Sequence, residues 1–199
     1  MWIVKLGGSL AGQAHLRPWL AQLARPAAGR RLIVPGGGPF ADAVRAAQPP
    51  IGYDSLAAHR MAILAMQQMA MAFIGLEPGL AAVESMAEIE ALEGAGVWLP
   101  WTLAGRDPSI QASWDVTSDS LALWLARRLG APDLVLVKSA PLPGPRAEVA
   151  ALTAAGILDP AFAALARGYR GRIHLLHAGW RGPLRLPLPD ACDVRVGPP

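Results

Sequence analysis

Short runs of consecutive apolar residues alternate along the chain with stretches in which apolar residues recur every three or four positions. Runs that are apolar throughout are typical of strands buried on both faces, and the helical spacing indicates helices packed against them. The predicted strands are 2–6, 31–35, 96–100, 134–137 and 172–177, with an edge strand near Val194. The predicted helices are 18–25, 40–47, 55–73, 84–93, 117–129, 147–155 and 160–166. This alternation predicts an α/β fold with a mostly parallel sheet covered on both faces.

The longest apolar segment covers residues 55–76, and Ser55 is the expected N-cap of its helix. Polar and basic side chains interrupt the segment, whereas a bilayer span needs about 20 nearly uninterrupted apolar residues. The segment therefore predicts a buried or interface helix and no membrane partner. Just before it, the prolines at 49–50 are expected to end the helix 40–47.

The composition fits one folded domain over residues 1–199. Apolar residues make up 53% of the chain and charged residues 17%, which allows a large core and argues against disorder. The net charge of +3 is spread along the chain, without the basic cluster that nucleic-acid binding requires. The single cysteine, Cys192, excludes an internal disulfide, and no signal peptide opens the chain. We therefore expect a cytoplasmic protein.

Two of the 18 basic residues are lysines, and each stands at the end of a predicted strand: Lys5 before Leu-Gly-Gly-Ser, and Lys138 before Ser139. A lysine ammonium is a compact, mobile charge that can follow a moving phosphoryl group. Ligands of parallel α/β sheets bind at the carboxyl ends of strands, where glycines let the backbone approach an anion. Biased codon usage and an ordinary glycine turn are the alternative explanation.

Two further motifs carry candidate chemistry. Gly36–Gly38 open the helix 40–47 and offer backbone N–H groups to a phosphate or carboxylate, although a tight turn between prolines would read the same way. In the polar loop 113–120, at least one hydroxyl caps the following helix. Asp119 lies in the first turn of that helix, where a carboxylate can hold a lysine ammonium or bind a magnesium-bearing nucleotide.

The histidines do not predict a metal site. His15, His174 and His177 lack the spacing to a third ligand that zinc requires. His59 lies on the apolar face of the helix 55–73, where a packed core histidine is the usual case.

Taken in order, three segments resemble the amino acid kinase superfamily, which includes acetylglutamate, aspartate, uridylate, carbamate and isopentenyl phosphate kinases. They are Lys-Leu-Gly-Gly-Ser at 5–9, Val-Pro-Gly-Gly-Gly-Pro-Phe-Ala-Asp at 34–42 and Ser-Trp-Asp-Val-Thr-Ser-Asp-Ser-Leu at 113–121. The resemblance covers roughly residues 2 to 140. With a fourth segment, Ser-Leu-Ala-Ala-His-Arg-Met-Ala-Ile at 55–63, these motifs most resemble one branch of the superfamily. That branch phosphorylates [5-(aminomethyl)-3-furyl]methyl phosphate in methanofuran biosynthesis.

The resemblance implies a three-layer αβα sandwich, with an acceptor lobe in residues 1 to about 110 and a shortened nucleotide lobe in residues about 111 to 199. It implies an enzyme that transfers the γ-phosphoryl group of ATP in line to a small phosphorylated metabolite. Magnesium would arrive with the nucleotide, without a direct protein ligand. Family members commonly form homo-oligomers, so we expect one here.

Carried over residue by residue, the resemblance also assigns site roles. The catalytic residues are Lys5, Asp119 and Lys138. The residues that cradle the nucleotide phosphates are Gly7, Gly8, Ser9 and Ser139. The acceptor-binding residues are Gly36, Gly37, Gly38, Phe40, His59, Ser113, Thr117 and Ser118.

The carboxyl half departs from the family pattern. Where many members have a Thr-Asp-Val-Asp-Gly loop, this chain has Lys138-Ser139-Ala140-Pro141. Lys138 is then either a second phosphoryl clamp, which we favour, or an exposed strand end. Two other functions stay open: a catalytically altered kinase-like partner or regulatory subunit, and a kinase for a carboxylate acceptor, for which Arg45 is the nearby arginine.

Overall fold

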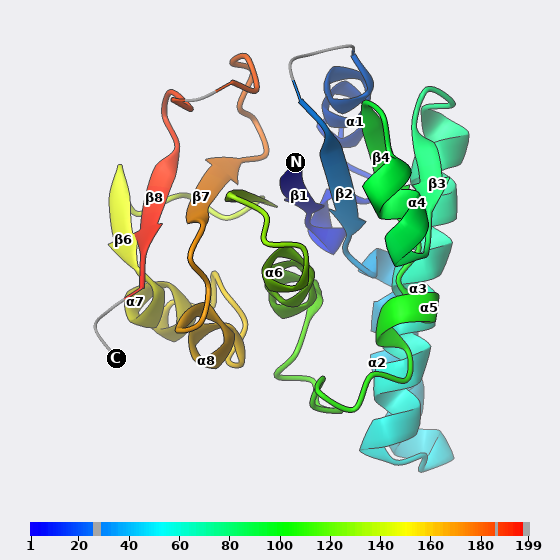
Figure 1. The fold of residues 1–199 in the computed structure, drawn as a ribbon. Coiled ribbons are helices and arrows are strands. Elements are labelled where there is room, and N and C mark those ends of the chain that lie inside the picture. Colours follow the sequence, from blue (N-terminus) through cyan, green and yellow to red (C-terminus); the bar gives the residue numbers. More distant parts are fainter. Residues whose placement is uncertain (26–28, 186, 197–199) are drawn as a thin grey trace.

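The computed structural model describes residues 1–25, 29–185 and 187–196, and its strands form one sheet (Figure 1). The strands are β1 (Trp2–Leu6), β2 (Arg31–Pro35), β3 (Ala81–Val83), β4 (Ala95–Trp98), β5 (Asp133–Lys138), β6 (Arg146–Glu148), β7 (Arg172–His177) and β8 (Cys192–Arg195). Their order across the sheet is β3-β4-β2-β1-β5-β7-β8-β6. Neighbours pair in parallel except β7 and β8, which are antiparallel. The predicted α/β fold with a mostly parallel sheet is confirmed.

Helices connect most of these strands. They are α1 (Leu16–Ala24), α2 (Gly38–Ile51), α3 (Ser55–Leu76), α4 (Met86–Ala91), α5 (Trp101–Ala104), α6 (Ser118–Arg128), α7 (Val149–Ala154) and α8 (Phe162–Ala166), with a 3-10 turn η1 (Gly8–Leu10) after β1. In the part of the chain that the structure describes, no helix is both long and apolar enough to cross a bilayer.

Strand β1 lies inside the sheet because its residues are apolar on both faces. Ile3 belongs to one buried cluster, together with Leu32 and Leu134 of the neighbouring strands and the apolar side of α6. Val4 belongs to a second buried cluster on the opposite face. Successive residues of a strand point to opposite faces, so an uninterrupted apolar run can serve two cores at once. The sheet is thus the middle layer between two hydrophobic cores.

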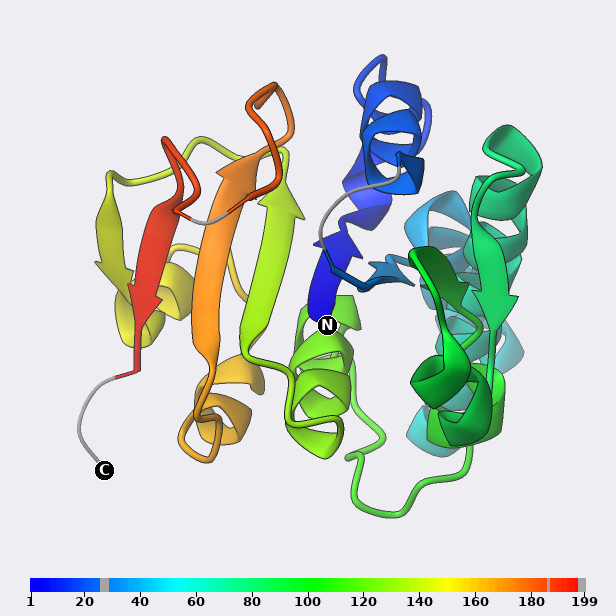
Figure 2. The ribbon, with the colours of Figure 1, turned by 45° about the horizontal axis from the view of Figure 1, so that its top comes forward.

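Helices α6, α7 and α8 supply the first core, and α1 supplies much of the second. Helix α3 contributes to both, with Ile63 in the first and Phe73 in the second. Beyond β5, where the strands β5, β7, β8 and β6 lie side by side (Figure 2), the β7–β8 connection covers part of the second face. Its Trp180 stacks on Trp19 of α1 with ring centroids 5.7 Å apart. This stack packs α1, near the amino terminus, against the β7–β8 connection in the carboxyl-terminal part of the chain.

The prediction that the prolines end the helix before residue 48 is wrong. Helix α2 runs through Pro49 and Pro50 and ends at Ile51. Its C-cap is Gly52, which has a positive φ of 83° and donates its N–H to the Gln48 carbonyl at 2.8 Å. Proline removes a donor and crowds the preceding turn. The carbonyls that lose a donor here are those of Arg45 and Ala46, in a helix that has no buried residue, so water can satisfy them.

Three other expectations need correction. The N-cap of α3 is Asp54, whose carboxylate accepts the Ala57 N–H at 2.7 Å, and not Ser55. The strand near Val194 is not an edge strand, because β8 lies between β7 and β6. The short strands β3 and β6 were not predicted, since each has three residues, most of them exposed, and is too short to give a strand pattern.

Candidate active site

The parallel strands bring the two lysines of the chain to one aspartate. Lys5 lies near the end of β1, Lys138 ends β5, and Asp119 lies in the first turn of α6. The Lys5 Nζ is 2.7 Å from Asp119 Oδ1, and the Lys138 Nζ donates a hydrogen bond to Asp119 Oδ2. The side chains are only 6%, 13% and 4% exposed for Lys5, Lys138 and Asp119. The three form a buried cluster with two cations and one anion, which we call the lysine–aspartate cluster.

The charges in this cluster shift one another's protonation. Burial alone would raise the pKa of Asp119, but the ammonium groups of Lys5 and Lys138 outweigh it and hold the pKa below its ordinary value. Asp119 is therefore an ionised carboxylate at neutral pH. Burial, aided by the charge of Lys5, lowers the pKa of Lys138, and Asp119 opposes that shift. The surplus positive charge is suited to an added anion such as a phosphate.

Two glycine turns touch each other directly beside the cluster. A Cβ on Gly8 would lie 2.4 Å from the Gly38 nitrogen, and a Cβ on Gly36 would lie 2.1 Å from the Gly8 nitrogen. The Gly36 N–H donates to the Leu6 carbonyl at 2.8 Å, which fixes the second turn against the end of β1. Side chains are excluded here by contact between backbones. Only glycine allows such an approach.

Hydroxyl groups border the same edge of the sheet. Ser9 Oγ and Ser139 Oγ lie 2.9 Å apart and link the turn after β1 to the turn after β5. No side chain caps the start of α2 at Gly37. The first N–H groups of a 14-residue helix thus lack a side-chain acceptor, and such groups bind anions readily.

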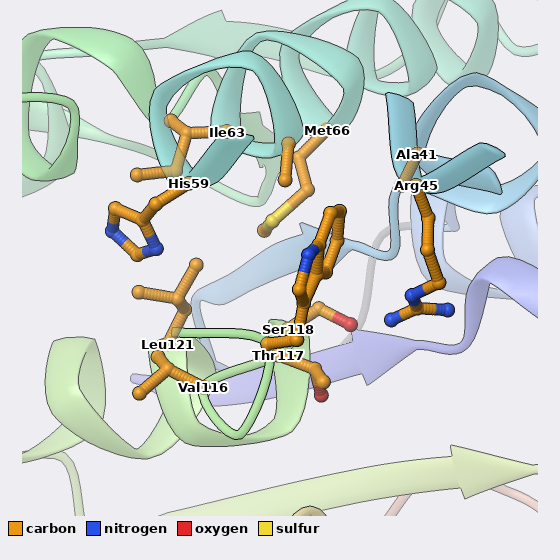
Figure 3. A pocket seen from close by; sticks show the side chains of 12 residues that line it. Ala41, Arg45, His59, Ile63, Met66, Val116, Thr117, Ser118 and Leu121 are labelled. Atoms are coloured by element: carbon orange, nitrogen blue, oxygen red, sulfur yellow. The ribbon is translucent and has the colours of Figure 1, made fainter. Parts of the chain in front are cut away.

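A cavity opens next to these turns, between α2, α3 and the loop before α6 (Figure 3). Apolar side chains form much of its wall, among them Ala41, Ala62, Ile63, Met66, Val116 and Leu121. His59 and Arg45 lie on opposite sides of the cavity in Figure 3, and Trp114 also lines it. The guanidinium carbon of Arg45 lies 4.4 Å from the centroid of the Trp114 ring, and the Trp114 indole N–H donates to Gln48 Oε1 at 2.7 Å.

His59 is buried within this cavity wall. Burial and the charge of Arg60 lower its pKa, so the imidazole is neutral at neutral pH. A neutral imidazole can donate one hydrogen bond and accept another. The cavity thus combines an apolar body with a few polar groups, which is the usual makeup of a small-molecule site.

The structure brings most of the predicted site residues together. Lys5, Asp119 and Lys138 meet, the turns at 7–9 and 36–38 adjoin them, and Ser139 contacts Ser9. The predicted acceptor residues that line the cavity are Gly37, His59, Thr117 and Ser118.

The other four predicted acceptor residues do not line the cavity: Gly36 and Gly38 belong to the glycine turn beside it, and Phe40 and Ser113 lie elsewhere. Phe40, in the first turn of α2, is 39% exposed and is not part of the cavity wall. Ser113 uses its Oγ to accept the Asp115 N–H at 3.1 Å, so it shapes the loop and does not face the cavity. Sequence position alone does not give the direction of a side chain at a helix start or in a loop.

Sequence reasoning missed Asp159, which lies between α7 and α8 and binds the start of α6. Its carboxylate accepts hydrogen bonds from Thr117 and Ser120. Trp114 was noticed only as part of a motif, although it forms the aromatic wall of the cavity. An aspartate followed by a proline is typical of a helix start, which is a structural role. The local sequence therefore gives no signal that connects Asp159 to the site.

Comparisons with known proteins agree with this geometry. The model of the amino acid kinase family matches residues 1–141. A [5-(aminomethyl)furan-3-yl]methyl phosphate kinase from Methanocaldococcus jannaschii is 28% identical over 139 residues, which cover 68% of this chain. The match spans 64% of that relative's length.

Solved structures of other kinases share the fold. The UMP kinase from Bacillus anthracis has a TM-score of 0.72 at 15% identity, covering 98% of this chain and 95% of its own. The uridylate kinase from Archaeoglobus fulgidus has a TM-score of 0.67 at 17% identity, covering 88% and 90%. The aspartate kinase from Synechocystis has a TM-score of 0.73 at 15% identity, covering 99% of this chain and 40% of its own. The family match covers more than half of the sequence, and the chain belongs to the amino acid kinase family.

Proposed function

We propose that this protein transfers the γ-phosphoryl group of ATP to a phosphate-monoester acceptor. The observation that carries the proposal is the lysine–aspartate cluster, in which both lysines of the chain converge beside two touching glycine turns. Family membership supports a phosphotransferase that uses ATP. We also propose the predicted division into lobes, with the acceptor lobe in residues 1 to about 110 and the nucleotide lobe in residues about 111 to 199.

In the proposed reaction, an oxygen of the acceptor's phosphate attacks the γ-phosphorus while the bond to the β–γ bridging oxygen breaks and ADP leaves. An ionised phosphate oxygen needs no proton removed, so no general base is required. Such transfers depend on positioning and on stabilising charge. Lys5 and Lys138 supply that charge, and Asp119 holds their ammonium groups in place.

The residues present fit the donor's phosphates. Gly7, Gly8 and Ser9 offer backbone and hydroxyl groups next to Lys5, and Ser139 offers a second hydroxyl next to Lys138. Asp119 is occupied by the two lysines, and the described residues contain no group of three metal-ligating side chains. We propose that magnesium is held by the nucleotide's own phosphates, where it would offset part of their charge.

The acceptor would bind in the cavity beside the glycine turns. Its apolar wall, the Trp114 ring and the neutral His59 suit a small, flat organic body, and the phosphate would face Gly36–Gly38 and Lys5. The M. jannaschii relative is named for a furan-methyl phosphate acceptor, which has this form. We propose [5-(aminomethyl)-3-furyl]methyl phosphate, in the biosynthesis of a methanofuran-like one-carbon carrier, as the first acceptor to test.

An ADP-release assay with a panel of phosphorylated furans, isoprenoids, nucleotides and amino acids tests the function. The panel should yield one acceptor whose diphosphate product is confirmed by mass spectrometry. Lys5→Ala should lower kcat about 10³-fold, since it removes a charge that acts on the transferring group. Arg17→Ala, which removes an exposed charge on α1, is the matched control. No ADP release above background with any acceptor, and no stabilisation by ATP-magnesium in a melting assay, would favour the regulatory-subunit alternative.

We also propose that the protein forms a homo-oligomer through α3. Four apolar side chains of this helix are 37% to 63% exposed: Leu56, Met61, Leu64 and Met71. Ile51 of α2, close by in sequence, is 71% exposed. Apolar side chains gathered along one long helix commonly mark an interface. Light scattering on the purified protein checks this, and a monomer at micromolar concentration would contradict it.

A further inference from the structure

Asp159 lies outside the lysine–aspartate cluster, yet its carboxylate is bound entirely to the turn that carries the cluster's aspartate. Oδ2 accepts the Thr117 N–H at 3.0 Å, the Thr117 hydroxyl at 2.7 Å and the Ser120 N–H at 3.0 Å. Oδ1 accepts the Ser120 hydroxyl. Asp159 itself is 7% exposed. A segment of the carboxyl-terminal half is thus fastened to residues 117–120.

This carboxylate is held without an ion pair. Among the described residues, no basic nitrogen lies within 4.0 Å of Asp159. A buried charge of this kind is costly unless hydrogen bonds and dipoles compensate it. The four hydrogen bonds and the positive end of the α6 dipole do so here.

The turn at 117–120 carries two parts of the site at once. Thr117 and Ser118 line the acceptor cavity, and Asp119 points to the two lysines. The N-cap bond within α6, from the Asp119 N–H to Thr117 Oγ1, is long at 3.4 Å and fixes little by itself. Asp159 supplies the shorter bonds, so the position of the turn depends on it.

We infer that Asp159 is a positioning residue for the proposed reaction: it holds the 117–120 turn so that Asp119 lies between the two lysines while Thr117 and Ser118 face the acceptor. The inference rests on the proposed function for its catalytic consequence. It makes the carboxyl-terminal half part of the acceptor site, although the family match ends at residue 141.

The charge of Asp159 also acts on Lys138, and this effect distinguishes a role in the active site from a role in stabilising the fold alone. Asp159 raises the pKa of Lys138, against the larger lowering by burial and by Lys5. Removing the negative charge should let Lys138 lose its proton at lower pH. If transfer needs a protonated Lys138, activity falls as the pH rises through that pKa, and the alkaline limb of kcat should move to lower pH in the variant.

Asp159→Asn tests both effects, since it keeps the size of the side chain and removes its charge. The chain has two lysines, so labelling lysine with carbon-13 at Cε gives two resonances, and Lys138→Arg assigns them. In Asp159→Asn the Lys138 resonance should titrate at lower pH than in the wild type. With an accepted substrate, kcat should fall about tenfold, the alkaline limb should shift, and KM should rise for the acceptor but not for ATP.

Two further variants keep the result interpretable. Asp115→Asn removes an exposed carboxylate from the same loop and should change neither the titration nor the kinetics. Ser120→Ala removes one of the four hydrogen bonds without a charge. It should lower kcat slightly and raise the acceptor KM, while leaving the Lys138 titration in place. If Asp159→Asn does not fold, a raised acceptor KM in Ser120→Ala still supports the inference and an unchanged one opposes it.

An unshifted Lys138 titration, with a kcat lowered equally at all pH values, would show that Asp159 only braces the fold. The titration needs no acceptor, so it gives its result even if no substrate is phosphorylated. Absence of transfer by the wild-type protein would count against the proposed function alone.

Discussion

A buried aspartate with two basic partners lies at each end of strand β5, but only one end is suited to bind an anion. At the carboxyl end, Asp119 holds Lys5 and Lys138. At the amino end, Asp133 accepts hydrogen bonds from Arg172 at 2.8 and 3.2 Å and lies 3.4 Å from His174. The aspartates are similarly buried, with 4% and 3% of their side chains exposed. Burial of an ion pair therefore does not distinguish the two.

The two clusters differ in the sign of their remaining charge. The lysine–aspartate cluster has two ammonium groups for one carboxylate, and the turns around it are glycines. At the other end, the arginine side chain is 62% exposed, and a second carboxylate, Asp193, lies 2.9 Å from His174. Two carboxylates there balance the basic groups. A surplus of buried positive charge beside open backbone is what marks a phosphate site.

Strand direction explains why the site is at one end. The parallel strands β1, β2 and β5 all end at the same edge, and connections to the helices leave space there. At the opposite edge, where β5 and β7 begin, the ion pairs link β5, β7 and β8 to one another. The amino-end cluster is thus expected to stabilise the fold, and the lysine–aspartate cluster to act on a ligand.

Among the variants that compare the two ends of β5, the largest expected effect comes from Asp119→Asn. Removing this charge leaves two buried ammonium groups without a counter-ion and frees them to move, so kcat should fall about 10²- to 10³-fold. Steady-state kinetics with the accepted substrate measures this. A variant with full activity would mean that the lysines need no aspartate to position them, and the contrast between the two ends would lose its main support.

The same residue gives the stability a pH dependence. Asp119 has a lowered pKa in the folded state, so it contributes stability above its unfolded value near 3.8, and that contribution is lost as the pH falls through the folded value. Urea unfolding from neutral to acidic pH should show this loss in the wild type. Asp119→Asn should lack that part of the acid dependence.

At the other end of β5, Asp133→Asn should affect stability and not turnover. The variant weakens the bonds to Arg172 and His174, and we expect a loss of about 2 kcal/mol in the free energy of unfolding. The exposed arginine can be hydrated when its partner is lost, which limits the cost. Urea unfolding gives the free energy, and kcat per folded molecule should stay unchanged. A kcat lowered more than tenfold would place this end of the strand in the mechanism.

Much of this contrast could be predicted from sequence, because it depends on elements with strong local signals. The apolar runs 2–6 and 134–137 predicted β1 and β5, and the carboxyl-end rule for parallel sheets then placed Lys5 and Lys138 together. Glycine turns are equally visible, since few other residues fit there. The resemblance to the family added Asp119 as the group between the lysines.

Other parts of the site have no local signal. Asp159 is 42 residues from Thr117 in sequence, and only the packing of α8 against α6 brings them together. The assignment of Phe40 to the acceptor stays a prediction, because the sequence of a helix start does not show which way a side chain turns, and Phe40 is 39% exposed. Helix α2 continued through two prolines since its exposed last turn tolerates lost hydrogen bonds. Long-range contacts and solvent exposure decided these cases.

The smallest expected effect tests whether the ion pairs of the amino-end cluster are independent of one another or coupled. Asp193 pairs with His174 but is 60% exposed, so solvent screens the interaction. Asp193→Asn should lower the free energy of unfolding by at most about 0.5 kcal/mol, and less at high salt, because exposed pairs contribute little. Urea unfolding at low and at 0.5 M sodium chloride (about 4 Å of screening length) measures this. A loss comparable to that of Asp133→Asn would show that His174 needs both carboxylates. The amino-end cluster would then be a cooperative network, and its difference from the lysine–aspartate cluster would rest on the sign of its charge alone.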